Sequence, residues 1–283
     1  MAALLIAIKL SVVLLTFAIG LGSAPGDVAY LWRRPGLLVR SLVAMYVAVP
    51  AAAVLMARTL PLSLPVKTAI VVVAISAGAP LLPRRLQKLG RQGYVFSLVV
   101  TASILAIGVV PLWLVAIDRI VGGNLAVNPW AVARLIAKAF LAPLVLGVLL
   151  RWPLPGVADR LSDWCLVVGN ALLAASGLTL LVLRGPLLIA AGWVPLAALG
   201  GMTLVSLAIG HALGGPDPDD RTALAVSCAT RHVGIAMLAA STVPGPRALT
   251  LVLAYLLATL AVSIPYLRWR SRVASPGAVV ASR

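Results

Sequence analysis

Residues 223–240 read ALAVSCATRHVGIAMLAA and place two basic side chains, Arg231 and His232, inside a run apolar enough to cross a bilayer. An arginine at the centre of a membrane helix costs roughly 2.5–3.5 kcal/mol on insertion scales. It normally faces the protein interior or a wet cavity, because lipid cannot satisfy its five N–H donors. Ser227 and Thr230 precede it and a glycine follows, which predicts a helix broken at mid-membrane. A continuous helix with a snorkelling or internally paired arginine is the alternative.

The composition is that of a polytopic membrane protein. The chain has 283 residues, of which 62% are hydrophobic and 11% are charged, and runs of about 20 apolar residues recur along it. Its formal net charge of +16 comes from basic residues in short loops between these runs, as topology signals do. We therefore expect the lipid bilayer as a partner and no nucleic acid. The two cysteines lie in apolar segments, so no disulfide framework, metal site or cofactor is expected.

Nine membrane spans are predicted from the apolar runs and the turns between them. They cover residues 2–22, 36–57, 66 to the prolines at 80 and 83, 94–117, 130–150, 164–183, 186–213, 223–240 and 248–267. The fold class expected is therefore an all-α membrane protein. A cleaved signal peptide is the alternative for the first run, but Pro25 directly after its small-residue end argues against cleavage.

The segments between spans complete this organisation. A basic helix or loop is expected at residues 84–91, a polar connector at 159–163 and an acidic turn at 214–220. The whole of residues 1–268 is interpreted as a single polytopic domain, followed by a basic tail at 269–283.

Lys and Arg are unevenly divided between the two sides of these spans. The loops after the first, third, fifth and seventh spans, with the tail, hold fourteen of them, and the opposite side holds eight. An excess of basic residues marks the cytoplasmic face. We therefore expect a multi-pass protein of the plasma membrane (cell inner membrane), with its N-terminus outside and its C-terminus in the cytoplasm.

Helix-breaking residues fall in the third and eighth spans, at Ser76 and Pro80 and again around Thr230. A spacing of five spans gives these two segments opposite directions through the membrane. Residues 1–117 and 128–268 are therefore expected to form an inverted repeat, in which the fifth span belongs to the second half and has no partner in the first. Interrupted spans at matching positions of two inverted halves point to the binding site of a secondary carrier.

Three stretches together resemble the bile acid:sodium symporter family of secondary carriers. Residues 229–238 (ATRHVGIAML) look like its second crossover helix, and residues 76–80 (SAGAP) look like the break of the first. Residues 96–103 (FSLVVTAS) resemble the segment that follows, with Ser97 and Thr101 in its spacing. The similarity covers nearly the whole chain in order. It implies inverted five-helix repeats that lack the first helix here, two discontinuous crossing helices, and a panel domain that moves against a core domain.

The resemblance also implies a sodium site, from which this chain departs. Members that use sodium place a carboxylate where this chain has Ser227 and an amide where it has Arg231, and the chain contains no glutamate. Ser97 and Thr101 remain as residual ion-binding residues. Arg231 is therefore expected to replace the sodium ion and to bind a substrate's negative charge. The full set of substrate-binding candidates is Arg231, His232, Thr230, Ser227, Pro80 and Ser76.

The expected function is that of a secondary transporter for a small organic anion, not strictly coupled to sodium. The coupling ion stays open between sodium and a proton, and His232 is interpreted as a packed neutral histidine in preference to a pH-dependent binding residue. The alternative function is a degenerate carrier fold that acts as a sensor or subunit without transport. An enzyme is not expected, because every Asp lies in a loop or at a span end and neither His belongs to a recognisable dyad.

The topology gives a first testable prediction. A reporter fused after Arg272 should give a cytoplasmic signal, and one inserted in residues 124–128 should give an external signal, because the basic excess and the odd number of spans place these points on opposite sides. Reporter fusions in intact cells measure this, and the reverse pattern would exclude the nine-span arrangement.

Overall fold

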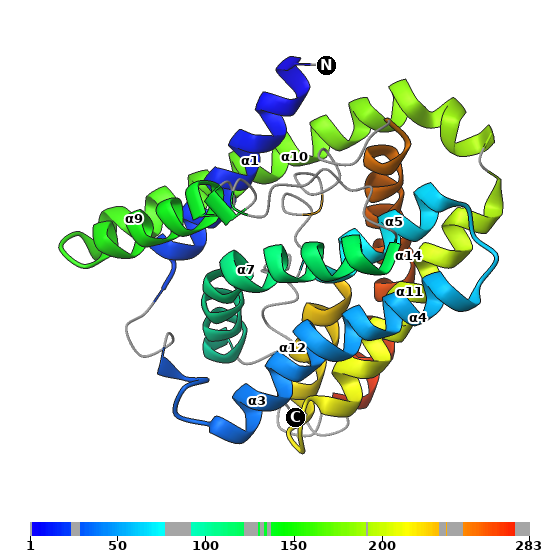
Figure 1. Ribbon diagram of the computed structural model, residues 1–283. Coiled ribbons are helices and arrows are strands. Elements are labelled where there is room, and N and C mark those ends of the chain that lie inside the picture. The colour runs from blue at the N-terminus through cyan, green and yellow to red at the C-terminus, as the bar shows by residue number, and fades with distance from the viewer. Residues whose placement is uncertain are drawn as a thin grey trace.

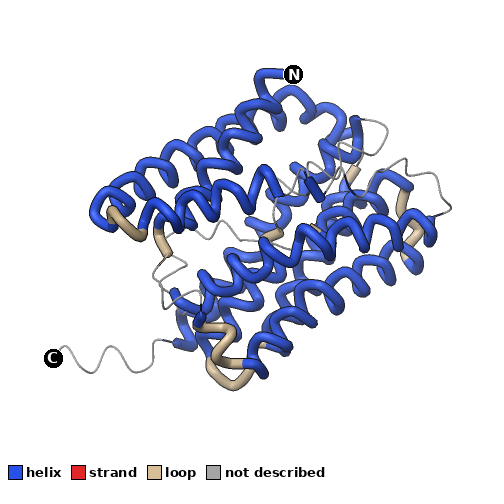
Figure 2. The backbone as a smooth tube through the Cα atoms, turned by 60° about the vertical axis from the view of Figure 1, so that its left-hand side comes forward, coloured by secondary structure: helices blue, strands red, loops and turns tan. Residues whose placement is uncertain are grey.

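The computed structural model describes residues 2–23, 29–76, 92–121, 130, 133–134, 137–190, 192–231, 236 and 246–274. Throughout these residues the regular secondary structure is helical (Figures 1 and 2), which confirms the all-α prediction. Five helices in this part of the chain are long and apolar enough to cross a membrane: Pro35–Thr59, Gly93–Ala116, Pro155–Thr179, Trp193–Leu213 and Thr250–Arg272. The shorter apolar helices are Ile6–Leu21 and Leu64–Ile75.

The described residues form ten α-helices and two π-helices in chain order. They are α1 (Ala2–Leu21), α3 (Pro35–Val43), the π-helix η1 (Ala44–Ala48), α4 (Val49–Thr59), α5 (Leu64–Ile75), α7 (Gln92–Val121), the π-helix η2 (Ala137–Leu141), α9 (Ala142–Arg151), α10 (Pro155–Ala190), α11 (Trp193–Leu213), α12 (Pro218–Ala229) and α14 (Pro246–Ala274). Proline stands in the first turn of α3, α4, α5, α9 and α12, where its missing N–H would have no partner in the helix anyway.

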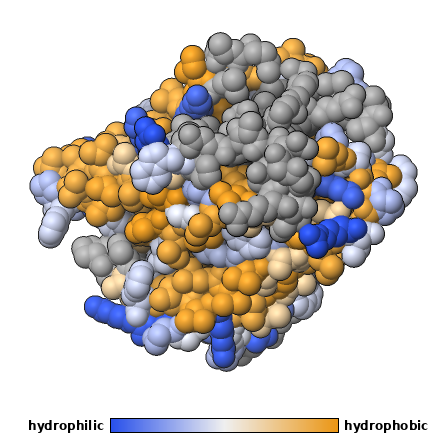
Figure 3. Space-filling view, viewed as in Figure 1, coloured by the Kyte–Doolittle hydropathy of each residue, from blue (hydrophilic) through white to orange (hydrophobic). Residues whose placement is uncertain are grey.

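The outer surface of the helices is that of a membrane protein. Large apolar side chains such as Leu112 and Val182 are exposed, and Figure 3 shows broad apolar areas over the described part of one face. Exposed tryptophans stand at or next to helix ends, among them Trp152 and Trp193. Tryptophan collects at the two interfaces of a membrane with water. These features and the long apolar helices establish a multi-pass membrane protein.

Two predicted boundaries around α10 are wrong. Residues 159–163 were expected to be a polar connector, yet they lie inside α10, where Asp159 pairs with Arg151 at 2.8 Å and the Ser162 hydroxyl donates to the Ala18 carbonyl at 3.0 Å. Because these partners satisfy the polar side chains, the helix continues through them. Pro186 was expected to begin the next span, but α10 continues through it to Ala190. The break comes at Gly192, whose φ of 77° is a conformation that glycine adopts readily.

The ends of α12 and α14 also differ from the prediction. The helix α12 begins at Pro218, within the expected acidic turn, because Asp217 caps it by accepting a 2.9 Å hydrogen bond from the Asp219 amide. The helix α14 continues past residue 268 to Ala274. It carries Arg270, which is buried and donates to the Thr222 hydroxyl at 2.8 Å and to the Pro218 carbonyl at 2.7 Å. Residues 269–274 therefore belong to the helical bundle.

The helices pack in two groups (Figure 1). The helix α1 packs against α9 and α10, whereas α11 packs against α12 and α14, and α5 packs against α4 and α14. The two groups meet where α10 packs against α14. Glycine allows the closest crossings: a methyl group on Gly147 of α9 would lie 2.5 Å from the Phe17 carbonyl oxygen of α1. A carrier with a panel domain and a core domain requires its helices to pack in two groups of this kind. The movement of the panel against the core and the inverted repeat stay predictions.

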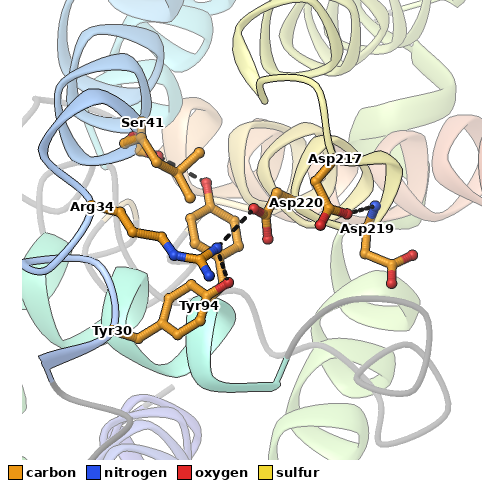
Figure 4. A network of polar contacts seen from close by, with 8 residues as sticks. Tyr30, Arg34, Ser41, Tyr94, Asp217, Asp219 and Asp220 are labelled. Carbon is orange, nitrogen blue, oxygen red and sulfur yellow. Dashed lines mark hydrogen bonds and ion pairs between the residues drawn. The ribbon is translucent and has the colours of Figure 1, made fainter.

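A polar cluster joins segments distant in sequence at the start of α12 (Figure 4). Arg34 approaches Asp220 at 3.8 Å and donates to the Tyr30 hydroxyl at 2.5 Å. Arg34 and Asp220 lie in the loops after the first and seventh predicted spans, so their contact joins these two loops. The bonds of Arg270 to α12 add the segment that follows the ninth predicted span. The predicted topology puts these three segments on one side. Which side of the membrane they occupy stays a prediction.

The crossing of α11 and α12 leads to a stability prediction. A methyl group on Gly210 would lie 2.5 Å from the Ala225 Cα, so Gly210→Ala should destabilise the protein by about 1–3 kcal/mol through overpacking. The control is Gly108→Ala in α7, where the methyl meets no atom within 4 Å and should be neutral or stabilising by up to about 1 kcal/mol. Thermal unfolding in detergent compares them, and equal midpoints would contradict the close crossing.

Candidate functional site

The candidate site begins where α12 ends. After Ala229 the backbone of Thr230 is extended (φ −86°, ψ 91°), and its hydroxyl donates to the Val226 carbonyl at 2.6 Å. Tyr255 of α14, itself buried, donates its hydroxyl to the Ala229 carbonyl. The Tyr255 bond satisfies a carbonyl that a helix end otherwise leaves without a partner. With twelve residues, α12 is about 18 Å long and so cannot by itself cross a hydrocarbon core of about 30 Å.

The helix α5 ends in a similar way. It also has twelve residues, and Ser76 follows it with a non-helical backbone. The Ser76 side chain is buried and donates to the Val72 carbonyl at 2.7 Å, which caps the last turn. Pro80 and His232 lie outside the described residues. The breaks and the crossing of the two helices therefore stay predictions, although both helices end at the positions that these predictions require.

Arg231 directly follows the end of α12 and is buried, with 4% of its surface exposed. Its Nη1 donates to the Met45 carbonyl in the π-helix η1 at 3.1 Å. Its Nε and Nη2 are buried and make no hydrogen bond within the described part of the chain. The two aspartates of α12 are in its first turn, at the opposite end of that helix. Among the described residues, the guanidinium is thus held by a single neutral acceptor.

The acceptor is available because of a proline. In η1 the Val49 amide donates to the Ala44 carbonyl, five residues back, so the Met45 carbonyl loses the donor that an α-helix would give it. The next amide along the chain would belong to residue 50, which is Pro50 and has no N–H. The Met45 carbonyl therefore needs a donor from elsewhere, and Arg231 supplies it.

Two further bonds hold η1 against α7. The Tyr46 hydroxyl donates to the Ala102 carbonyl, and the Trp113 indole donates to the Tyr46 carbonyl at 2.9 Å. Ala102 and Trp113 both lie in α7, the helix that carries Ser97 and Thr101 one turn apart. The structure therefore fixes the acceptor for Arg231 against the helix that bears the two residual ion-binding candidates.

The hydroxyl groups predicted for the site have different surroundings. Ser227 Oγ and Thr101 Oγ1 are buried and, among the described residues, have no hydrogen-bond partner. The buried Ser97 hydroxyl accepts a bond from the Leu31 amide at 3.0 Å, so it has a structural role at the connector before α3. The structure brings Ser227, Thr230 and Arg231 together at the end of α12, and α7 packs against this helix.

Sequence reasoning missed the residues that position Arg231. They are Met45, Tyr46, Pro50, Trp113 and Tyr255. Part of the signal was available: a tyrosine in an apolar run needs a partner for its hydroxyl, and a proline inside a span leaves carbonyls without donors. Which donor reaches those carbonyls depends on contacts between helices, which the sequence does not give.

A comparison with protein families matches residues 9–190 to the Sodium Bile acid symporter family. The chain belongs to this family. The match runs from within α1 to the end of α10, which confirms the resemblance seen in the sequence motifs. Sodium bile acid symporters are membrane transporters, in agreement with the long apolar helices. The helix α12 and Arg231 lie beyond the matched residues, so the assignment of the site rests on its geometry alone. No curated protein matches the chain.

The capping of α12 is open to test by mutation. Tyr255→Phe removes the donor to the Ala229 carbonyl and leaves a buried acceptor unsatisfied, which should destabilise the protein by about 1–3 kcal/mol. Tyr30→Phe is the control, since its hydroxyl pairs with Arg34 at the surface, where water replaces it. Thermal unfolding in detergent measures both, and an equal effect of the two variants would contradict a buried cap at the end of α12.

Proposed function

We propose that the protein is a secondary carrier that moves a small organic anion across the membrane and binds its negative charge at Arg231. The observation that carries this proposal is the buried guanidinium, whose Nε and Nη2 have no partner among the described residues while Nη1 is held by the Met45 carbonyl. Nε and Nη2 lie on one edge of the planar group and direct their N–H bonds the same way. A carboxylate or sulfonate presents two oxygens that match such an edge in a bidentate pair.

The energetics favour a negatively charged ligand. A buried cation without a counter-charge costs several kcal/mol after relaxation, and one neutral carbonyl recovers only part of this. An anion that pairs with the remaining edge offsets that cost and gains charge-assisted hydrogen bonds of about 1.5–3 kcal/mol each. Ser227 and Thr101 add buried hydroxyls that can donate to further oxygens of the same ligand.

The same charge argues against strict coupling to sodium. Two like charges 4 Å apart at an effective dielectric of about 20 repel by about 4 kcal/mol, which corresponds to roughly three decades of affinity. The chain also has Ser227 where sodium-using members of the family have a carboxylate, and it contains no glutamate. We infer that Arg231 replaces the sodium ion in neutralising the substrate. A proton remains the alternative coupling ion.

The packing supports a carrier mechanism. The helices α5 and α12 both end after twelve residues, and α1, α9 and α10 pack together in a group that contacts the rest of the bundle where α10 meets α14. We propose that this group is the panel and that its movement opens the site to each side in turn. We also place the protein in the plasma membrane with its C-terminus in the cytoplasm.

Uptake into proteoliposomes tests the proposal. Radiolabelled cholate, taurocholate and benzoate supply carboxylates and a sulfonate, and we expect at least one to be taken up at the same rate in sodium and potassium buffers of equal ionic strength. Arg231→Gln should abolish binding and uptake, because its amide keeps polarity but loses the charge. The matched control is Arg58→Gln, which removes an exposed cation from the end of α4 and should leave uptake unchanged.

The outcomes separate the alternatives. Strict dependence on sodium, or undiminished binding in Arg231→Gln, would contradict the proposal. Binding of these anions without uptake would instead favour the alternative function of a sensor or subunit built on the carrier fold.

A further inference from the structure

We propose that Pro50 is a positioning residue for substrate binding. Because Pro50 has no N–H, the Met45 carbonyl is free to accept a hydrogen bond from Nη1 of Arg231. This hydrogen bond fixes the guanidinium so that its Nε–Nη2 edge faces the anion. The inference rests on the proposed function, and it identifies a residue on a different helix that determines how the binding group is oriented.

The first step is the hydrogen-bond register around η1. Val49 donates to the Ala44 carbonyl in the wide π register, so the Met45 carbonyl would be next in line for the amide of residue 50. Pro50 has no amide hydrogen. Both Pro50 and Met45 are buried, so water does not replace the missing donor at the Met45 carbonyl. The carbonyl must therefore find a side-chain donor, or it remains an unsatisfied acceptor inside the bundle.

The second step is that the π shift and the proline together leave the neighbouring Tyr46 carbonyl without a backbone donor as well. In a regular α-helix the amide of residue 50 would donate to the Tyr46 carbonyl, four residues back. That carbonyl instead accepts the Trp113 indole at 2.9 Å. The shift of the Val49 amide to the Ala44 carbonyl and the missing N–H of Pro50 together leave two consecutive carbonyls, and donors from α7 and from the end of α12 bind one each.

The third step is the effect on Arg231. An arginine side chain has several rotatable bonds, and ordering it at the moment of binding would reduce the affinity for a ligand. The bond from Nη1 to Met45 orders the group beforehand and occupies the edge that is not used for the anion. The Tyr46 bond to Ala102 in turn holds η1 on α7, so the acceptor itself is fixed.

The first experiment requires no substrate. Arg231→Met removes the donor to the Met45 carbonyl and cannot replace it. The change in thermal unfolding midpoint caused by Arg231→Met should therefore be more favourable in a Pro50→Ala background than in the unmutated protein, because the new N–H of residue 50 can bind the Met45 carbonyl. Pro50→Gly supplies the same N–H and serves as a second variant. Pro265→Ala in α14 is the control and should leave the effect of Arg231→Met unchanged. Additive shifts of Pro50→Ala and Arg231→Met would overturn the inference.

The second experiment measures uptake of the same radiolabelled cholate, taurocholate and benzoate. Pro50→Ala should raise the KM about tenfold with little change in maximal rate, because the guanidinium is still present but no longer held in place. Pro265→Ala, the control of the first experiment, should keep the KM of the unmutated protein.

The results separate this inference from the proposal on which it rests. An unchanged KM in Pro50→Ala, with Arg231→Gln inactive, would overturn the role of Pro50 and leave the proposed function standing. Absence of uptake by the unmutated protein would overturn the proposed function, and this role of Pro50 with it.

Discussion

The bond between Arg231 Nη1 and the Met45 carbonyl is the interaction on which the candidate site depends. It joins segments 186 residues apart and fixes the residue after the end of α12 on the π-helix η1. Neither partner would be stable in this position alone. The guanidinium would be a buried cation without an acceptor, and the carbonyl would lack a donor because of Pro50. The surrounding bonds of Tyr46, Trp113 and Tyr255 hold the helices that bring the two together.

The arrangement also suggests how one family fold can accommodate a different charge balance. A sodium site stabilises an anion indirectly, through an ion that the protein must first desolvate with carboxylate and amide oxygens. Here the positive charge belongs to the protein, and its cost is shared between one backbone carbonyl and, on our proposal, the substrate. A fixed charge needs no ion gradient for binding, but it must be oriented by the protein, which gives the π-helix and its proline a function.

Much of the fold was predictable from hydropathy and from single residues that conflict with it. The all-α membrane class follows from the apolar runs, and the ends of α5 and α12 lie where small and polar residues interrupt them. The burial of Arg231 was predicted for the same reason, since lipid does not accommodate a guanidinium. The family was recognised from motifs at 76–80, 96–103 and 229–238, and the match over residues 9–190 confirms it.

Other features depend on contacts that a sequence does not contain. Polar residues at 159–163 suggested a connector, but partners on α9 and α1 satisfy Asp159 and Ser162 within a continuous helix. The acceptor for Arg231 is a backbone carbonyl, which every residue has, so no residue type indicated Met45. The contributions of His232 and Pro80 stay predictions, because both lie outside the described residues.

The most direct test of the account is an experimental structure of the protein with 4-bromobenzoate, whose bromine identifies the anion in the density. The account predicts both carboxylate oxygens about 2.7–3.2 Å from Nε and Nη2 of Arg231, with Nη1 still donating to the Met45 carbonyl. An anion bound elsewhere, or a protein acceptor occupying the Nε–Nη2 edge, would contradict it.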